Sequence, residues 1–324
     1  LLDLYWRRIG PDGNFPLREM AELTAAALTG VRLNCAQCHK HPFDRWTQDD
    51  YAAFTNIFSR VVYGSSSEVN IAIFSELERR RQAREDGQKV RSLPRLGEVF
   101  ASKTLGRSIA GSDKGVAVMP RAFDSPEFDT DKDLREQFFE WLVEEDNSWF
   151  ARNLVNRVWA VYFGVGIVEP VDDFSISNPP SHPLLLKELA QQFVDSNFDI
   201  RYLEKQILMS SAYQRTSTPN ETNRNDHRNF ARQYVRPLLA EVALDVINKG
   251  LGTTEDFGDQ APKGSMAIEV GANQLQNDAG RQLKILGRSQ RKSVCDCDRR
   301  TENDLRQFVF LINDQSIARK IQNG

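Results

Sequence analysis

The 324 residues are 40% hydrophobic and 27% charged, the composition of an ordinary folded protein with room for one large domain or two. The 42 basic and 45 acidic side chains give a net charge of −3, so neither a nucleic-acid-binding surface nor an acidic tail is indicated. No run approaches the roughly 20 apolar residues of a membrane-spanning helix. We therefore expect no nucleic-acid partner and no transmembrane segment in this chain.

The sequence opens at Leu1 without an initiator methionine, a basic region or the apolar core of a signal peptide. This predicts a fragment or a processed product whose signal peptide is not part of the sequence. Apolar residues at helical spacing predict two helices in the first region, over residues 16–33 and 48–58. Thr47 and Asp50 have the spacing of a capping box, with Asp in place of Glu, and should start the second helix.

Between these two helices lies the stretch Cys35-Ala36-Gln37-Cys38-His39. Two cysteines at this spacing, followed at once by histidine, form the motif of covalent c-type haem attachment. Cysteines three residues apart fit one helical turn, so both sulfurs can reach the two vinyl groups of one porphyrin. The motif therefore predicts haem c, with Cys35 and Cys38 as tethers and His39 as an axial ligand of the iron.

The second axial ligand would decide the chemistry of such a haem. A histidine or methionine favours electron transfer, whereas an open site favours ligand binding or peroxide chemistry. The candidates are His182, Met119, Met20 and an open site, with His182 slightly preferred because it lies in a loop bounded by proline. A simpler role for His182 is to cap the helix that begins at the next residue.

The remaining cysteines form a second close pair, Cys295 and Cys297. Four thiolates complete a tetrahedral zinc site, to which His41 could also contribute. Alternatively, the two pairs form disulfides that tie distant parts of the chain together. In either case the protein would have a structural or binding role and no redox role. The zinc alternative requires Cys35 and Cys297 to converge on one ion, which the haem alternative does not need.

The middle of the chain, residues 60–125, differs in composition from the regions on either side, with a Gly-Ser stretch, a charged run and scattered glycines. This composition predicts an insertion with short strands at 69–74, 98–101 and 116–119 and a solvated helix at 76–85. After residue 125, helical patterns cover 134–144, 149–163, 183–194, 200–211, 238–251 and 305–322. The predicted class is mainly α with a small β-containing insertion, in regions 1–59, 60–125 and 126–324.

The segment GVRLNCAQCHKHPFDRWTQDDY, residues 30–51, resembles the end of the planctomycete-type cytochrome-like domain. Residues 156–159, 163–166, 169–174, 178–183 and 294–299 resemble the domain of unknown function that usually follows it. The resemblance implies an exported bacterial protein, periplasmic or extracellular, that holds haem and works with a redox partner protein or an upstream cytochrome domain. It assigns no enzymatic activity, and the chain has no phosphate-binding loop, nucleophile elbow or zinc-protease motif.

Overall fold

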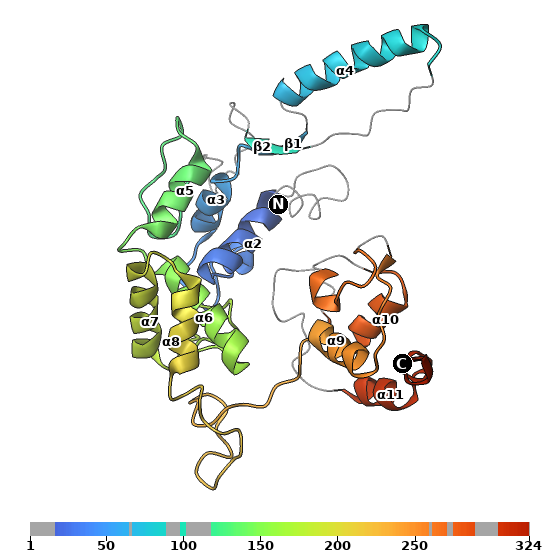
Figure 1. The fold of residues 1–324 in the computed structure, drawn as a ribbon. Helices are drawn as coiled ribbons and strands as arrows, with labels where there is room; N and C mark the ends of the chain where they lie inside the picture. The colour runs from blue at the N-terminus through green and yellow to red at the C-terminus, as the bar shows by residue number, and fades with distance from the viewer. Residues whose placement is uncertain are drawn as a thin grey trace. The chain divides into compact units, whose positions relative to one another are not determined.

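The computed structural model describes residues 17–64, 67–88, 98–101, 118–258, 261–270, 275–288 and 304–323. These residues are mainly helical, as predicted (Figure 1). The chain divides into two compact units, Leu1–Phe150 with Ser175–Ser177, and Ala151–Phe174 with Asn178–Gly324. No described helix is long and apolar enough to cross a membrane.

The core of the first unit joins three helices, α2 (Leu17–Thr29), α3 (Gln48–Asn56) and α5 (Leu134–Val143). Phe54 of α3 is fully buried at its centre. Its ring stacks on Phe123 at a centroid distance of 4.9 Å and meets Phe138 of α5 edge-on at 5.5 Å. The first unit is therefore held together by aromatic residues that lie far apart in the sequence.

The predicted capping box at the start of α3 is confirmed. The Thr47 hydroxyl accepts a hydrogen bond from the Asp50 amide at 3.2 Å, and the Asp50 carboxylate accepts one from the Thr47 amide at 2.8 Å. Asp50 also forms an ion pair with Arg121 at 2.5 Å. Burial alone would raise the pKa of Asp50, but the bonds from Thr47 and the charge of Arg121 hold it below its ordinary value.

Replacing Asp50 with Asn should lower the free energy of unfolding by about 1–2 kcal/mol near neutral pH, because the ion pair with Arg121 is lost and the bond from the Thr47 amide is no longer charge-assisted. A carboxylate with a depressed pKa stabilises the fold above its unfolded-state pKa, and this contribution disappears as the pH falls through the folded-state value. Urea titrations of both proteins at pH 7 and pH 3 test this expectation. A stability difference as large at pH 3 as at pH 7 would contradict it.

The insertion is more helical than predicted. Strand β1 (Val61–Gly64) pairs antiparallel with β2 (Glu98–Ala101). Residues 69–74, predicted as a strand, instead belong to the helix α4 (Ser67–Glu85), and residues 118 and 119 are not in a strand. Ion pairs one turn apart, such as Glu76 with Arg80 at 2.7 Å, support the helix where periodicity suggested two separate elements. The described part of the insertion is thus mainly α4, whereas residues 116 and 117 lie outside the described chain.

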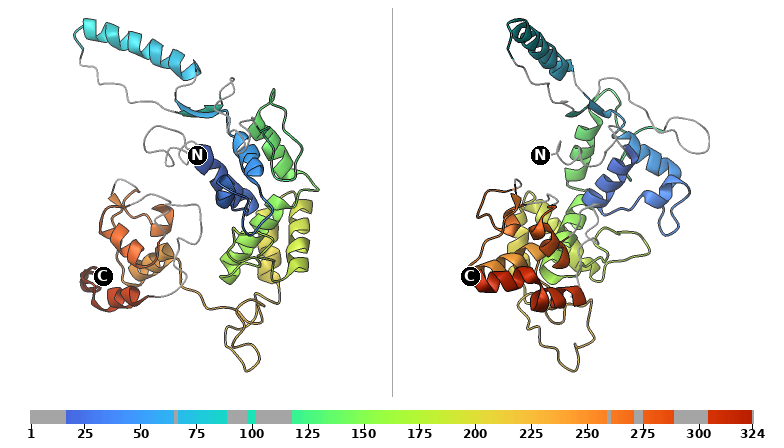
Figure 2. Two further views of the ribbon diagram at one scale, coloured as in Figure 1. Left: turned by 180° about the vertical axis from the view of Figure 1, so that it is seen from behind. Right: turned by 90° about the vertical axis from the view of Figure 1, so that its right-hand side faces the viewer.

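The second unit begins at Ala151, inside α6 (Trp149–Phe163), and continues with α7 (Pro183–Asp195) and α8 (Ile200–Met209). Helices α7 and α8 lie side by side (Figures 1 and 2). Trp159 stacks on Phe163 at 4.1 Å, and α6 is followed by Gly164, whose φ of 79° gives a left-handed cap. The buried Asn156 accepts from the amide of Val168 and donates to its carbonyl, both at 2.9 Å, so one side chain fixes the loop after α6.

A further core in the second unit gathers Leu244, Phe257 and Leu283. Its elements are α9 (Ala240–Gly250), η3 (Ala267–Val270) and α10 (Asp278–Ile285), of which α10 was not predicted. The single helix predicted over 305–322 is wrong, since the chain forms α11 (Leu305–Asn313) and α12 (Gln315–Asn323).

The break between α11 and α12 lies at Asp314, whose backbone is extended. Its carboxylate accepts from the amide and hydroxyl of Ser316, at 2.9 and 2.6 Å, and so caps the second helix. Arg281 of α10 donates two bonds to the same carboxylate at 2.8 and 3.0 Å. These contacts hold the pKa of Asp314 far below its usual range.

Candidate functional site

The Cys-x-x-Cys-His motif lies on a short 3-10 helix, η1 (Asn34–Gln37), and the residues that follow it. Leu33 and Ala36 are buried in the core of the first unit, which fixes the backbone on both sides of the first thiol. Cys35, Cys38 and His39 are exposed. The fold therefore presents two thiols and an imidazole to solvent from one anchored turn.

A carboxylate of α2 ties this turn to the helices on either side. Glu22 accepts a hydrogen bond from the Asn34 side chain at 2.6 Å and another from the Tyr51 hydroxyl of α3 at 2.9 Å. Burial, together with the bond to Glu22 and its charge, raises the pKa of Tyr51 well above its usual range, so the hydroxyl remains a donor. Asn34, the residue before Cys35, is therefore hydrogen-bonded to the same Glu22 carboxylate as Tyr51 of α3.

The loop after the motif is closed by a backbone bond from the His41 amide to the Trp46 carbonyl at 2.8 Å. Trp46 is only 3% exposed, and its ring lies 4.8 Å from Phe123 and 6.1 Å from Trp149. Burial of a tryptophan is worth several kcal/mol in a protein core. Burial of Trp46, the last residue of the loop, therefore holds the loop from His41 to Trp46 in place.

Arg45 reinforces the loop from the outside. Its guanidinium donates to both oxygens of Asp124 at 2.8 and 2.6 Å and lies 4.6 Å from the centroid of the Trp46 ring. About half of each charged side chain is exposed, so solvent screening leaves this pair a small contribution. Burial of the Trp46 indole therefore contributes most to the stability of this loop, and the Arg45 side chain lies over the indole ring.

The ring of His39 is held in one tautomer. Its Nδ1 atom lies 2.7 Å from the Lys40 carbonyl, which can only accept, so Nδ1 carries the hydrogen. In the neutral ring the lone pair is then on Nε2. A backbone carbonyl bonded to Nδ1 is the arrangement by which proteins orient histidine ligands of metals. The donor set at the motif therefore fits haem: two exposed thiols and one imidazole with an available Nε2 lone pair.

The other predicted ligands are distributed as follows. Cys35 and Cys38 are free thiols, and Cys295 and Cys297 lie outside the described residues. Within the described chain, no three His, Cys, Asp or Glu side chains are grouped so that they could hold a metal ion. The zinc and disulfide alternatives stay predictions, because both also need Cys295 and Cys297.

His182 belongs to the second unit, at the N-cap position of α7 as its simpler role predicted, but its side chain makes no capping bond. Its Nδ1 atom lies 3.1 Å from the Ser181 hydroxyl, and its ring lies 5.6 Å from that of Phe230. Met20 is buried in the core of the first unit, whereas Met119 is partly exposed. The identity of the second axial ligand stays a prediction.

Two family models match the chain. Residues 14–63 match PSCyt2, a protein family of unknown function (DUF1549), and residues 134–323, more than half of the chain, match PSD1, a protein family of unknown function (DUF1553). The chain belongs to the PSD1 family. No curated protein and no solved structure shows significant similarity to it.

The PSD1 match does not coincide with a compact unit. It begins at α5, yet Phe138 and Trp141 of α5 pack in the first unit's core. Phe138 contacts Phe54 and Phe58, which lie inside the PSCyt2 match. The two family matches therefore share one core.

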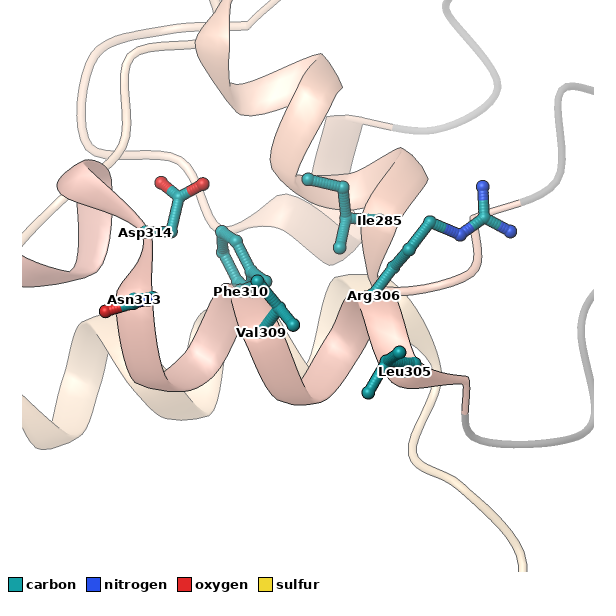
Figure 3. Close-up of a pocket in the computed structure, with 7 residues that line it drawn as sticks. All are labelled: Ile285, Leu305, Arg306, Val309, Phe310, Asn313 and Asp314. Atoms are coloured by element: carbon teal, nitrogen blue, oxygen red, sulfur yellow. The ribbon is translucent and has the colours of Figure 1, made fainter.

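The PSD1 match also includes an apolar groove of about 370 Å³ at α10 and α11 (Figure 3). The sequence did not predict it, because Asn313 and Asp314, which line the groove, were expected inside a single helix over 305–322. Exposed apolar residues on α11 are the signal that could have indicated it. It is lined by Ile285, Leu305, Arg306, Val309, Phe310, Asn313 and Asp314.

Proposed function

We propose that this chain is an exported c-type haem protein that transfers electrons to a redox partner protein or an upstream cytochrome domain. The observation that carries the proposal is the exposure of Cys35, Cys38 and His39 on one turn that the buried residues Leu33 and Ala36 anchor in the core. The tautomer of His39 supports it further, because the lone pair on Nε2 is the one that ligates iron.

In this proposal Cys35 and Cys38 would hold the porphyrin covalently, each by addition of its S–H group across one vinyl group, so that no atom is lost and no oxidant is needed. His39 would hold the iron through Nε2, with its ring oriented by the Lys40 carbonyl. The bound haem supplies reversible one-electron chemistry, with a potential set by its axial ligands and surroundings.

The zinc and disulfide alternatives make a different prediction. Both need Cys295 and Cys297, so the two cysteine pairs should be equally important for them. In the haem proposal only Cys35 and Cys38 form bonds to the cofactor. Substitution of the two pairs in parallel therefore separates the alternatives.

The test is expression of the full chain in a bacterial periplasm that contains the c-type haem maturation machinery, followed by acid-acetone extraction and a haem stain. The wild-type protein and a Cys295→Ser/Cys297→Ser control should retain about one covalent haem per chain. The Cys35→Ser/Cys38→Ser variant should retain none. Bound zinc without haem in the wild type, lost equally from both double variants, would overturn the proposal.

A further inference from the structure

We infer that His41 is a binding residue for the porphyrin carboxylates, to which it donates a hydrogen bond from Nε2. This inference rests on the proposed function and extends it from the iron to the haem periphery. It comes from the hydrogen bonds around two imidazoles that lie two residues apart, His39 and His41.

The two rings are held in opposite tautomers. His39 donates from Nδ1 to a carbonyl, whereas the Nδ1 atom of His41 lies 3.3 Å from the Phe43 amide nitrogen. An amide N–H can only donate, so Nδ1 of His41 must carry the lone pair. The hydrogen of the neutral His41 ring is therefore on Nε2, while that of His39 is on Nδ1. One ring offers a lone pair at Nε2 and the other offers an N–H group.

This difference separates their possible roles. In the tautomer that this contact indicates, His41 is a donor at Nε2, while its Nδ1 lone pair accepts from the Phe43 amide. The ring is half-buried and set in the loop that Trp46 anchors in the core. Its orientation is thus fixed before any ligand arrives, which lowers the entropic cost of a hydrogen bond to a ligand.

The remaining question is which group accepts from Nε2. No described residue accepts a hydrogen bond from this atom. A porphyrin tethered at Cys35 and Cys38 has two propionates as its charged groups. Carboxylates are the strongest acceptors for an N–H donor, and such bonds are about twice as strong as neutral ones. A propionate is therefore the acceptor that matches this donor.

Two substitutions test the hydrogen bonds of the two ring nitrogens of His41 separately. In His41→Asn the side-chain oxygen can still accept from the Phe43 amide, but the donor at the Nε2 position is lost. In His41→Gln a donor is retained at about the reach of Nε2. A His227→Asn variant serves as the control, because His227 is exposed in the second unit.

The experiment measures covalent haem content, the visible spectrum and the midpoint potential of the matured full chain. Loss of a donor leaves more negative charge on the propionate and favours oxidised iron. We expect His41→Asn to lower the equilibrium constant for reduction about fivefold, which is about 40 mV at 59 mV per tenfold for one electron. His41→Gln and His227→Asn should stay within about twofold of the wild type, with unchanged haem content and spectrum in all variants.

Three results would overturn the inference. The first is a wild-type potential in His41→Asn. The second is a His41→Gln potential equal to that of His41→Asn, because a restored donor would then have no effect. The third is a change of iron spin state in His41→Asn, which would make His41 an iron ligand. A wild-type chain without covalent haem would overturn the proposed function itself, and the haem stain reveals this before any potential is measured.

Discussion

Phe138→Ala should lower the free energy of unfolding of the first unit by about 3–5 kcal/mol, although Phe138 lies inside the PSD1 match. The side chain is 4% exposed and contacts the rings of Phe54, Phe58 and Trp141. Its removal leaves a cavity between α3 and α5, which the aromatic neighbours can fill only in part. Urea unfolding of the full chain, with hydrogen exchange of the α3 amides to assign the transition, measures the loss.

The adjacent residue provides a matched control for this measurement. Phe139 is 64% exposed on the same helix, so Phe139→Ala should change stability by no more than about 0.5 kcal/mol. Equal effects of the two substitutions would show that α5 does not belong to the first core. Destabilisation seen only in second-unit amides would contradict the shared core in the same way.

Lys320→Ala should lower the free energy of unfolding of the second unit by about 3–5 kcal/mol. The substitution leaves the carboxylate of Glu255 poorly solvated and without a positively charged partner. The Lys320 ammonium is buried and donates to Asn248 at 2.7 Å, Glu255 at 2.5 Å and Gln282 at 3.0 Å. These three bonds use all three of its hydrogens and connect α12 to α9, α10 and the loop that follows α9.

The control for Lys320 is Lys284→Ala in α10, an exposed position where the change should stay within about 0.5 kcal/mol. A Lys320→Met/Glu255→Leu double variant removes both charges and should recover most of the stability lost in Lys320→Ala. Thermal and urea unfolding of the four proteins measure these differences. A cost below about 1 kcal/mol for Lys320→Ala would mean that the buried pair has little role in holding α12.

Elements with local signals could be predicted from the sequence. The pattern of α6, closed by Gly164, and the capping box of Thr47 and Asp50 depend only on residues within a few positions of each other. The break at Asp314 could not be predicted in this way, because apolar periodicity continues across it and Arg281 contacts it from 33 residues earlier. In α4, β-branched residues such as Ile71 and Ile73 suggested a strand, although they belong to a continuous helix.

For the candidate site, the Cys-x-x-Cys-His motif identified the residues, but it did not predict the tautomers of the histidines or the exposure of the thiols. The tautomers of His39 and His41 depend on a carbonyl and an amide in a loop whose shape is set by the burial of Trp46. No local pattern encodes that burial, since the rings of Phe123 and Trp149 come from much later in the chain. The exposure of the thiols likewise follows from tertiary packing of Leu33 and Ala36.

That exposure has a consequence for the order of events during biogenesis. The turn that carries Cys35 and Cys38 is anchored by protein contacts alone, from Ala36 in the core to Asn34 on Glu22. In the haem proposal, folding of the first unit would therefore not need the cofactor as a nucleus. A haem lyase would then meet the two sulfurs on the surface of an already folded unit, and haem attachment would be a late modification rather than a folding step.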